Sequence, residues 1–214
     1  MSVGSARSCL YIAISYAQQR LAVGPKGESD TPIFNYQLQQ NALVPLLTRS
    51  IALGLFHVMC KDIFQNPKGH EHDLHMLCSI DKTMNGWNLE RVSSICRERC
   101  GGQGYLSVNK FGDYMATAHA ALTAEGDNRV LMVKICKDMM KNIKKKDMVL
   151  PQMTMCPFRQ IAQENDVTSL ETLHNLMMFR ETMLFDKLMK DTFTLKKEGK
   201  SNYDILMRET SDVM

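Results

Sequence analysis

The sequence predicts an all-α protein, with an antiparallel four-helix bundle of long helices followed by part of a second helical domain. Three observations support this fold class. Apolar residues recur at spacings of three and four along several long segments, which is the period of one helix face. We find no convincing series of strands, internal repeat or low-complexity tract. The 17 methionines and the aromatic content of 7% favour helix packing by flexible side chains over a β-sandwich.

The composition narrows the classes of partner. A chain of 214 residues can bury a sizeable core, and its net charge of +3 gives no electrostatic case for nucleic acid. The seven cysteines are odd in number and scattered, which favours reduced thiols over a disulfide framework, and their spacing completes no zinc site. No signal peptide is visible and no apolar run approaches the ~20 residues of a bilayer span. We therefore expect a soluble protein with no metal and no membrane span.

The first two helices are predicted from their apolar stripes. Residues 2–21 form a helix that Gly24 and Pro25 stop, and residues 26–32 form a polar loop. A second helix runs from about residue 35 to residue 64. Pro45 lies inside it and should either kink it or mark its first turns.

A third helix begins near Leu74 and ends at the glycine pair 101–102, with Gly86 as a weak point in its middle. His70, His72 and His75 precede or open this helix. They invite a metal interpretation, but only His72 and His75 share a helix face, so a surface helix start is favoured. The glycines of GGQG at 101–104 follow a helix rather than a strand, which argues against a dinucleotide fingerprint.

The segment after these glycines is predicted as an irregular polar and aromatic stretch that leads to Glu125. A fourth helix then runs over residues 129–143, for which Asp127 or Asn128 is a good N-cap. The backbone around Glu125 therefore lies near the positive end of a helix dipole. A carboxylate held there can be a general base, or it can be an ordinary acid before a helix start.

The domain boundary is predicted in the loop-like stretch that follows, which carries two prolines. We expect a helical bundle domain over residues 1–148 and the start of a second helical domain over residues 149–214. A capping box at Thr168 and Glu171 opens the next helix, and a last short helix stops at Met214.

Two motifs together resemble one known family. The pattern CGG-x-GY at 100–105, followed about twenty residues later by T-x-EGDN-x-V at 123–130, resembles the acyl-CoA oxidases in residue type, order and spacing. The segments YAQQRLAVG at 16–24 and NYQLQQ at 35–40 are similar to the same family. The EGDN sequence looks like the oxidase version rather than the EG-T version of acyl-CoA dehydrogenases, which are one alternative. Val23 and Ala124, each in place of an aromatic residue, favour a second alternative, a non-enzymatic helical interaction module.

The resemblance implies an activity and a set of residues. Glu125 would be the base that removes the α-proton of a fatty acyl-CoA, giving trans-2-enoyl-CoA and hydrogen peroxide in fatty acid β-oxidation. Arg20 would reach the pyrophosphate of FAD in a neighbouring subunit of a homodimer. The other implied contacts to the cofactor are Gln37, Gly101, Gly102, Asp127 and Asn128, and those to the substrate are Gly126 and Tyr105.

The resemblance also bears on location and completeness. Family members are mostly peroxisomal, but the residues 212–214 are not the SKL-type address, so a cytoplasmic location is the alternative. Members also carry an N-terminal helical domain and a β-domain before the segment that begins here. We therefore expect a fragment, a short product or a shortened paralogue, and an inactive isolated chain.

Overall fold

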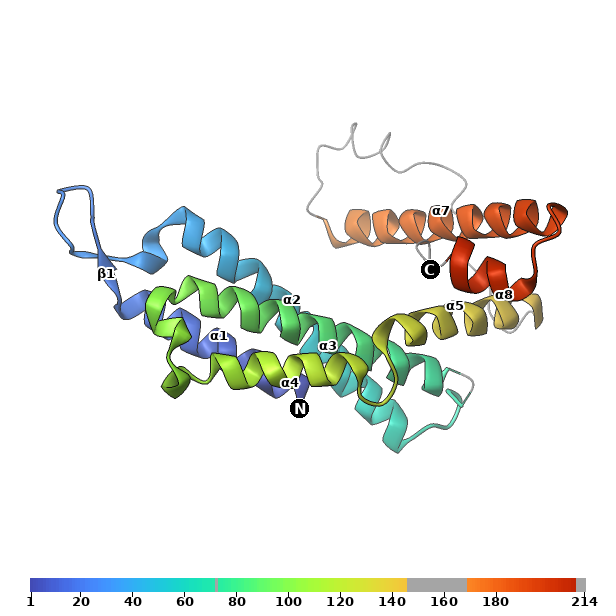
Figure 1. Ribbon diagram of the computed structural model, residues 1–214, viewed down its shortest axis with the longest axis horizontal. Coiled ribbons are helices and arrows are strands. Elements are labelled where there is room, and N and C mark those ends of the chain that lie inside the picture. Colours follow the sequence, from blue (N-terminus) through green and yellow to red (C-terminus); the bar gives the residue numbers. More distant parts are fainter. Residues whose placement is uncertain (72, 146–168, 211–214) are drawn as a thin grey trace. The chain divides into compact units, whose positions relative to one another are not determined.

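The computed structural model describes residues 1–71, 73–145 and 169–210, and it divides into two compact units, residues 1–132 and 133–214. Long helices make up nearly all of the described chain (Figure 1). The only strands in those ranges are the two-residue β1 (Leu21–Ala22) and β2 (Thr31–Pro32), which pair antiparallel. The all-α prediction is confirmed.

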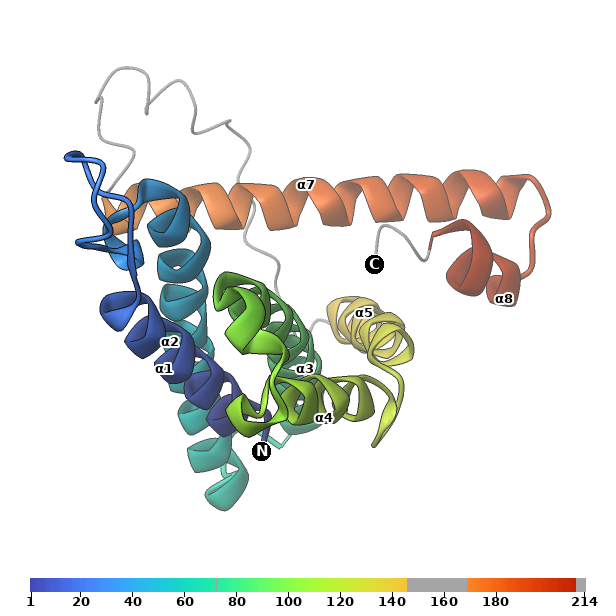
Figure 2. The same cartoon turned by 60° about the vertical axis from the view of Figure 1, so that its left-hand side comes forward.

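The first unit is built around a central helix. α3 (Leu74–Arg99) packs against α1 (Ser2–Gln19), α2 (Gln37–Gln65) and α4 (Phe111–Thr123), as Figures 1 and 2 show from two sides. Small side chains on α1 let α3 approach closely. The buried core of this unit comprises Ala6, Cys9, Leu10, Ala13, Ala17, Leu43, Leu46, Leu89, Val92, Cys96, Cys100, Phe111 and Ala118.

The boundaries of the first three helices agree with the predicted ones to within a few residues. A single 3-10 turn, η1 (Ile33–Asn35), precedes α2, and Pro45 lies inside α2. At the end of α3, Gly101 takes a φ of +57° and begins the 3-10 turn η2 (Gly101–Tyr105). Gly104 is buried against the backbone of Arg97, where a Cβ atom would clash. The glycine cluster therefore ends α3 and closes back on it, after which a second 3-10 turn, η3 (Ser107–Asn109), leads to α4.

The prediction of an irregular stretch between the glycines and Glu125 is wrong, because α4 occupies most of it. The sequence did carry a signal for this helix, since Phe111, Tyr114, Met115, Ala118 and Leu122 follow the spacing of one helix face, and Phe111 and Ala118 are buried. Four alanines among its 13 residues also give it a strong intrinsic helix preference. α4 packs against α1 and α3, whereas α5 (Asn128–Lys145), predicted from residue 129, leads into the second unit.

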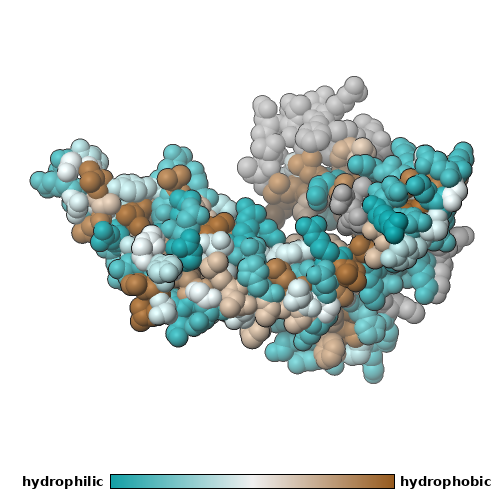
Figure 3. Space-filling view, viewed as in Figure 1, coloured by the Kyte–Doolittle hydropathy of each residue, from teal (hydrophilic) through white to brown (hydrophobic). Residues whose placement is uncertain are grey.

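α2 carries an outer face that the described chain leaves uncovered. Figure 3 shows apolar side chains reaching the surface in several places, and on α2 the most exposed are Leu38, Leu55 and Phe64. By length and composition, with a mean hydropathy of 1.6, α2 alone among the described helices could cross a membrane. Its inner face packs on α1 and α3, and a core helix passes the same test. A membrane span is therefore not supported.

The second unit contains most of α5, α7 (Leu170–Lys197), α8 (Asn202–Asp204) and a π-helical turn, η4 (Ile205–Glu209). The N-cap of α7 is Ser169, whose Oγ atom accepts a hydrogen bond from the N–H of Thr172 at 3.1 Å. Thr168 of the predicted capping box, the predicted boundary at 148/149, residues 150–163 and Met214 lie outside the described residues, as does His72. The two-domain division at 148/149 stays a prediction.

Candidate functional site

Glu125 lies in a strained turn between α4 and α5. Its φ is +59° and that of Gly126 is +104°, so two consecutive residues of the connection have left-handed backbone conformations. A side chain in this region costs ~1–2 kcal/mol, which Gly126 avoids and Glu125 does not. The Glu125 side chain is exposed, and neither its carboxylate nor its N–H has a hydrogen-bond partner among the described residues. Strain of this kind is found at functional sites.

A cavity of about 350 Å³ lies beside this turn, within the first unit. Its apolar wall is made of small side chains, Ala120, Ala121 and Ala124. Its polar wall comes from α2 and α3, and Met1, Ser2 and Val3 of α1 complete it. Glu125 is one of the lining residues, so an acidic residue lies at a cavity that has both an apolar and a polar side.

Lys82 of α3 connects the cavity wall to the Glu125 turn. Its Nζ atom donates hydrogen bonds to the carbonyl of Gly126 and to Oδ1 of Asn128, both at 2.6 Å, and to the carbonyl of Leu122 at 3.4 Å. The Nδ2 atom of Asn128 donates to the carbonyl of Thr83 at 3.2 Å. The turn is therefore attached to two consecutive residues of α3.

Asp127 and Asn128 perform different structural tasks. The Oδ1 atom of Asp127 accepts hydrogen bonds from the N–H groups of Arg129 and Val130 at 2.9 and 3.2 Å, which confirms Asp127 as the N-cap of α5. Asn128 is only 2% exposed, and both polar atoms of its amide bind α3. The geometry favours an anchoring role for Asn128, and the cofactor contacts implied for both residues stay predictions.

The cavity also contains a hydrogen-bonded chain that the sequence analysis missed. The Nδ1 atom of His57 on α2 lies 2.8 Å from Oδ2 of Asp81, and the Nδ2 atom of Asn85 donates to Oδ1 of Asp81 at 2.8 Å. The sequence signal that could have predicted this chain is the set of polar residues within α3, a helix that packs against three others. Buried polar side chains in a packed helix require partners, and here the partners line the same cavity as Glu125.

The remaining predicted residues lie at the opposite end of the first unit (Figure 1). Arg20 follows the end of α1, whose first residues line the Glu125 cavity, and 18 helical residues span ~27 Å. Gln37 begins α2, and both glycines 101–102 and Tyr105 follow the end of α3. The structure thus brings the predicted residues together as two separate groups rather than one.

The Arg20 end offers donors without partners. The Arg20 side chain is exposed and forms no ion pair among the described residues. The guanidinium of Arg99, at the end of α3, pairs with Glu98 at 3.2 Å, while its buried Nε atom has no hydrogen-bond partner among the described residues. The exposed guanidinium of Arg20 suits an anionic ligand.

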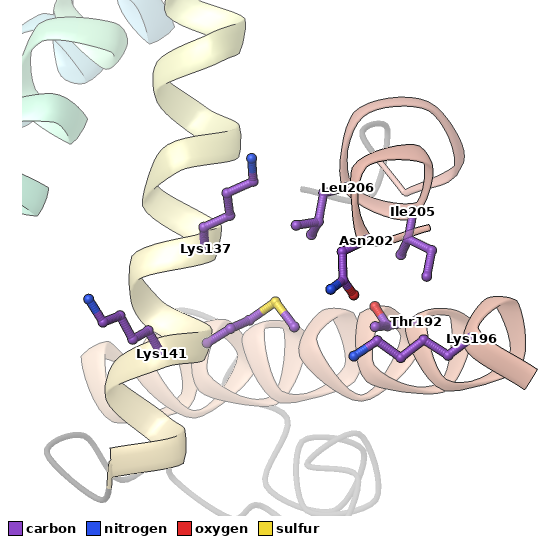
Figure 4. Close-up of a pocket in the computed structure, with 8 residues that line it drawn as sticks. Lys137, Lys141, Thr192, Lys196, Asn202, Ile205 and Leu206 are labelled. Atoms are coloured by element: carbon purple, nitrogen blue, oxygen red, sulfur yellow. The ribbon is translucent and has the colours of Figure 1, made fainter. Parts of the chain in front are cut away.

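The second unit has a cavity of about 460 Å³ between α5, α7, α8 and η4. Figure 4 shows Lys137 and Lys196 directed toward it and Lys141 directed away, with Met140 and Leu206 among the apolar lining. Among the described residues that line it, none has a carboxylate and none is a predicted site residue. Among the described residues, no group of three or more His, Cys, Asp or Glu is arranged to hold a metal ion. The Glu125 cavity is therefore the candidate site for acid–base chemistry.

Comparison with known proteins gives consistent matches. Residues 2–140 match the family model of the acyl-CoA oxidase C-alpha1 domain. Acyl-coenzyme A oxidase 2, peroxisomal, of Arabidopsis thaliana is 33% identical over 150 residues, which are 68% of this chain and 22% of that protein.

Two solved structures from Caenorhabditis elegans share the fold. Acyl-CoA oxidase-1 complexed with FAD and ATP has a TM-score of 0.83 at 20% identity, covering 100% of this chain and 35% of that one. Acyl-CoA oxidase-2 bound with FAD, ascaroside-CoA and ATP has a TM-score of 0.80 at 19% identity, covering 99% and 34%. The chain thus spans between 22% and 35% of the length of these relatives.

Proposed function

Since this chain belongs to the acyl-CoA oxidase family, we propose that it forms the helical C-α1 part of an FAD-dependent acyl-CoA oxidase in which Glu125 is the catalytic base. The proposed reaction is the α,β-dehydrogenation of a fatty acyl-CoA to trans-2-enoyl-CoA, with hydrogen peroxide as the second product. One observation carries the assignment: within the family's motif, Glu125 occupies a strained, exposed turn at a cavity with its carboxylate unpaired.

The chemistry of the base follows from this geometry. The carboxylate of Glu125 takes the α-proton of the thioester, and because it is tied to no other group of the described chain it can accept that proton without first breaking a bond. Negative charge then develops on the thioester oxygen. The N–H of Glu125 is also unpaired, and a donor of this kind contributes ~3 kcal/mol to stabilising such an oxyanion.

The residues at the other end of the unit fit a flavin dinucleotide. FAD, when bound, supplies the hydride acceptor that oxygen later reoxidises. Arg20 would hold its pyrophosphate, with Gln37, Gly101 and Gly102 beside it, and its exposed guanidinium, which forms no ion pair among the described residues, supports an anionic ligand there. Arg20 and Glu125 lie about the length of α1 apart, so we propose that Arg20 serves the site of a second copy. This arrangement supports the predicted homodimer.

Substrate and location follow from the relatives. One is named peroxisomal and another was solved with an acyl-CoA conjugate, ascaroside-CoA. We infer a fatty acyl-CoA substrate and a peroxisomal location for this protein. The alanine wall of the cavity suits the apolar part of such a ligand.

The test is Glu125→Gln in the full-length protein that carries this chain, assayed for peroxide release with an acyl-CoA. Turnover should fall at least ~100-fold with flavin content unchanged, because the amide cannot accept the proton. Glu28→Gln, in the exposed loop before β2, is the matched control. Undiminished turnover in Glu125→Gln would remove it from the mechanism, and a wild-type protein that releases no peroxide would favour the non-enzymatic helical module.

A further inference from the structure

Lys82 is the only described lysine whose ammonium group binds both sides of the Glu125 turn. Its side chain is half-buried on α3, far before Glu125 in the sequence. The two strongest bonds are 2.6 Å long and end on Gly126 and Asn128, directly after Glu125. The third ends on Leu122, in the last turn of α4 before it.

These three bonds use the full donor capacity of an ammonium group, which has three N–H bonds and no acceptor. Lys82 therefore has no donor left for a substrate. Its positive charge also lies at the C-terminal end of α4, where unpaired helix carbonyls favour a cation. Hydrogen bonds from a charged donor are roughly twice as strong as neutral ones. The contacts describe a residue that holds the backbone in place.

The turn requires such a holding contact. Glu125 and Gly126 both have positive φ values, +59° and +104°, and Glu125 itself has no hydrogen bond among the described residues. Without external bonds, a non-glycine residue leaves this conformation for a less strained one. Asn128, bonded to Lys82 and to the carbonyl of Thr83, fixes the far side of the turn to the same helix.

We propose that Lys82 is a positioning residue for the proposed oxidase reaction: it fixes the Glu125–Gly126 turn and thereby the direction of the catalytic carboxylate. This inference rests on the proposed function. Lys82 also lines the cavity, and the proposed role acts through the backbone of the turn, to which its three hydrogen bonds are directed.

The test compares Lys82→Met with wild type in the full-length protein. Methionine keeps most of the half-buried stem and removes all three donors. We expect kcat to fall roughly 10- to 100-fold, which is the effect of misplacing a reacting group by about 1 Å. KM for the acyl-CoA and the flavin content should stay within about threefold, because the ammonium group of Lys82 is bonded to the turn. Lys82→Arg should recover part of kcat, because it keeps a charged donor.

Lys134→Met is the matched control, since Lys134 is an exposed lysine that pairs only with Asp138 at 3.0 Å. Hydrogen exchange gives the second measurement: the hydrogen-bonded N–H groups of Ala124, Arg129 and Val130, on the two sides of the turn, should exchange faster in Lys82→Met, while those of α1 should not change. A global loss of folding would appear as faster exchange everywhere, and Asn128→Ala, which removes one acceptor of Lys82, then replaces Lys82→Met in the comparison.

The outcomes separate this inference from the proposed function. If Glu125→Gln abolishes turnover while Lys82→Met keeps wild-type kcat, or if the N–H groups of Ala124, Arg129 and Val130 exchange as in wild type, the positioning role is refuted. If Glu125→Gln turns over normally, the proposed function fails, and exchange still shows whether Lys82 holds the turn. A parallel rise in KM and fall in flavin content would also count against a positioning role.

Discussion

A Cβ atom placed on Gly86 would lie 3.1 Å from the Nδ2 atom of Asn128. Glycine in the middle of a helix lowers its stability by ~1 kcal/mol, and the sequence analysis treated Gly86 as a weak point for that reason. In the structure, the missing side chain of Gly86 leaves space for the buried amide of Asn128, which anchors the Glu125 turn to α3.

Gly86→Val should therefore destabilise the protein, although valine has a higher helix propensity than glycine. Overpacking a buried site costs ~1–3 kcal/mol, and the side chain that must move is Asn128. Urea unfolding of the 214-residue chain measures the change. Gly112→Ala in α4 is the control, because a Cβ atom there meets nothing within 4 Å, and it should be neutral or slightly stabilising. Equal stability of Gly86→Val and wild type would contradict the contact.

Replacements at Glu125 should show an inverted order of stability. At an ordinary helix position alanine is ~1 kcal/mol more stable than glycine. At Glu125, where φ is +59°, glycine should be more stable than alanine by ~1 kcal/mol, because only glycine adopts this conformation without strain. Urea midpoints of Glu125→Gly and Glu125→Ala test this order, and a more stable alanine variant would show that the turn is unstrained.

Arg20→Ala should weaken flavin retention in the full-length protein, because its guanidinium is the predicted contact to the pyrophosphate. The 450 nm absorbance per protein after gel filtration, about the flavin maximum, is the measurement, and we expect a loss of at least tenfold in affinity, or ~1.4 kcal/mol. Arg91→Ala on the exposed side of α3 is the control. Arg7 on α1 is less suitable as the control arginine, since its guanidinium packs over Gly54 of α2 and its loss could disturb that contact. The same flavin content in both variants would show that Arg20 does not bind the flavin.

Stability should decrease with rising pH on the alkaline side. Burial raises the pKa of the Cys9 thiol from 9.0 to about 12. Above pH 9 the unfolded chain loses this proton while the folded chain keeps it, so the unfolded state binds fewer protons and the free energy of unfolding falls until the pH reaches the folded pKa. Urea unfolding between about pH 8 and pH 11 should show a shallower decline for Cys9→Ala than for wild type. Parallel declines would mean that Cys9 ionises equally in both states.

The sequence by itself determined the features that depend on neighbouring residues. Apolar residues at helical spacing determined α1, α2 and α3, because such a stripe must be buried against something. Asp127 was one of two N-cap candidates in the sequence, since the N–H groups that donate to its carboxylate lie two and three residues further along the chain. Glu125 could be singled out as a candidate base from its motif alone, without its environment.

Only the tertiary structure decided which elements meet. α4 carries apolar residues at helical spacing, but only the packing shows that this face is buried against α1 and α3. Lys82 and Asn128 are 46 residues apart, and no local pattern records that one completes the hydrogen bonds of the other. Arg20 and Glu125 both belong to family motifs, yet the length of α1 separates them. A motif specifies residues along the chain, whereas the packing of helices decides which residues share a site.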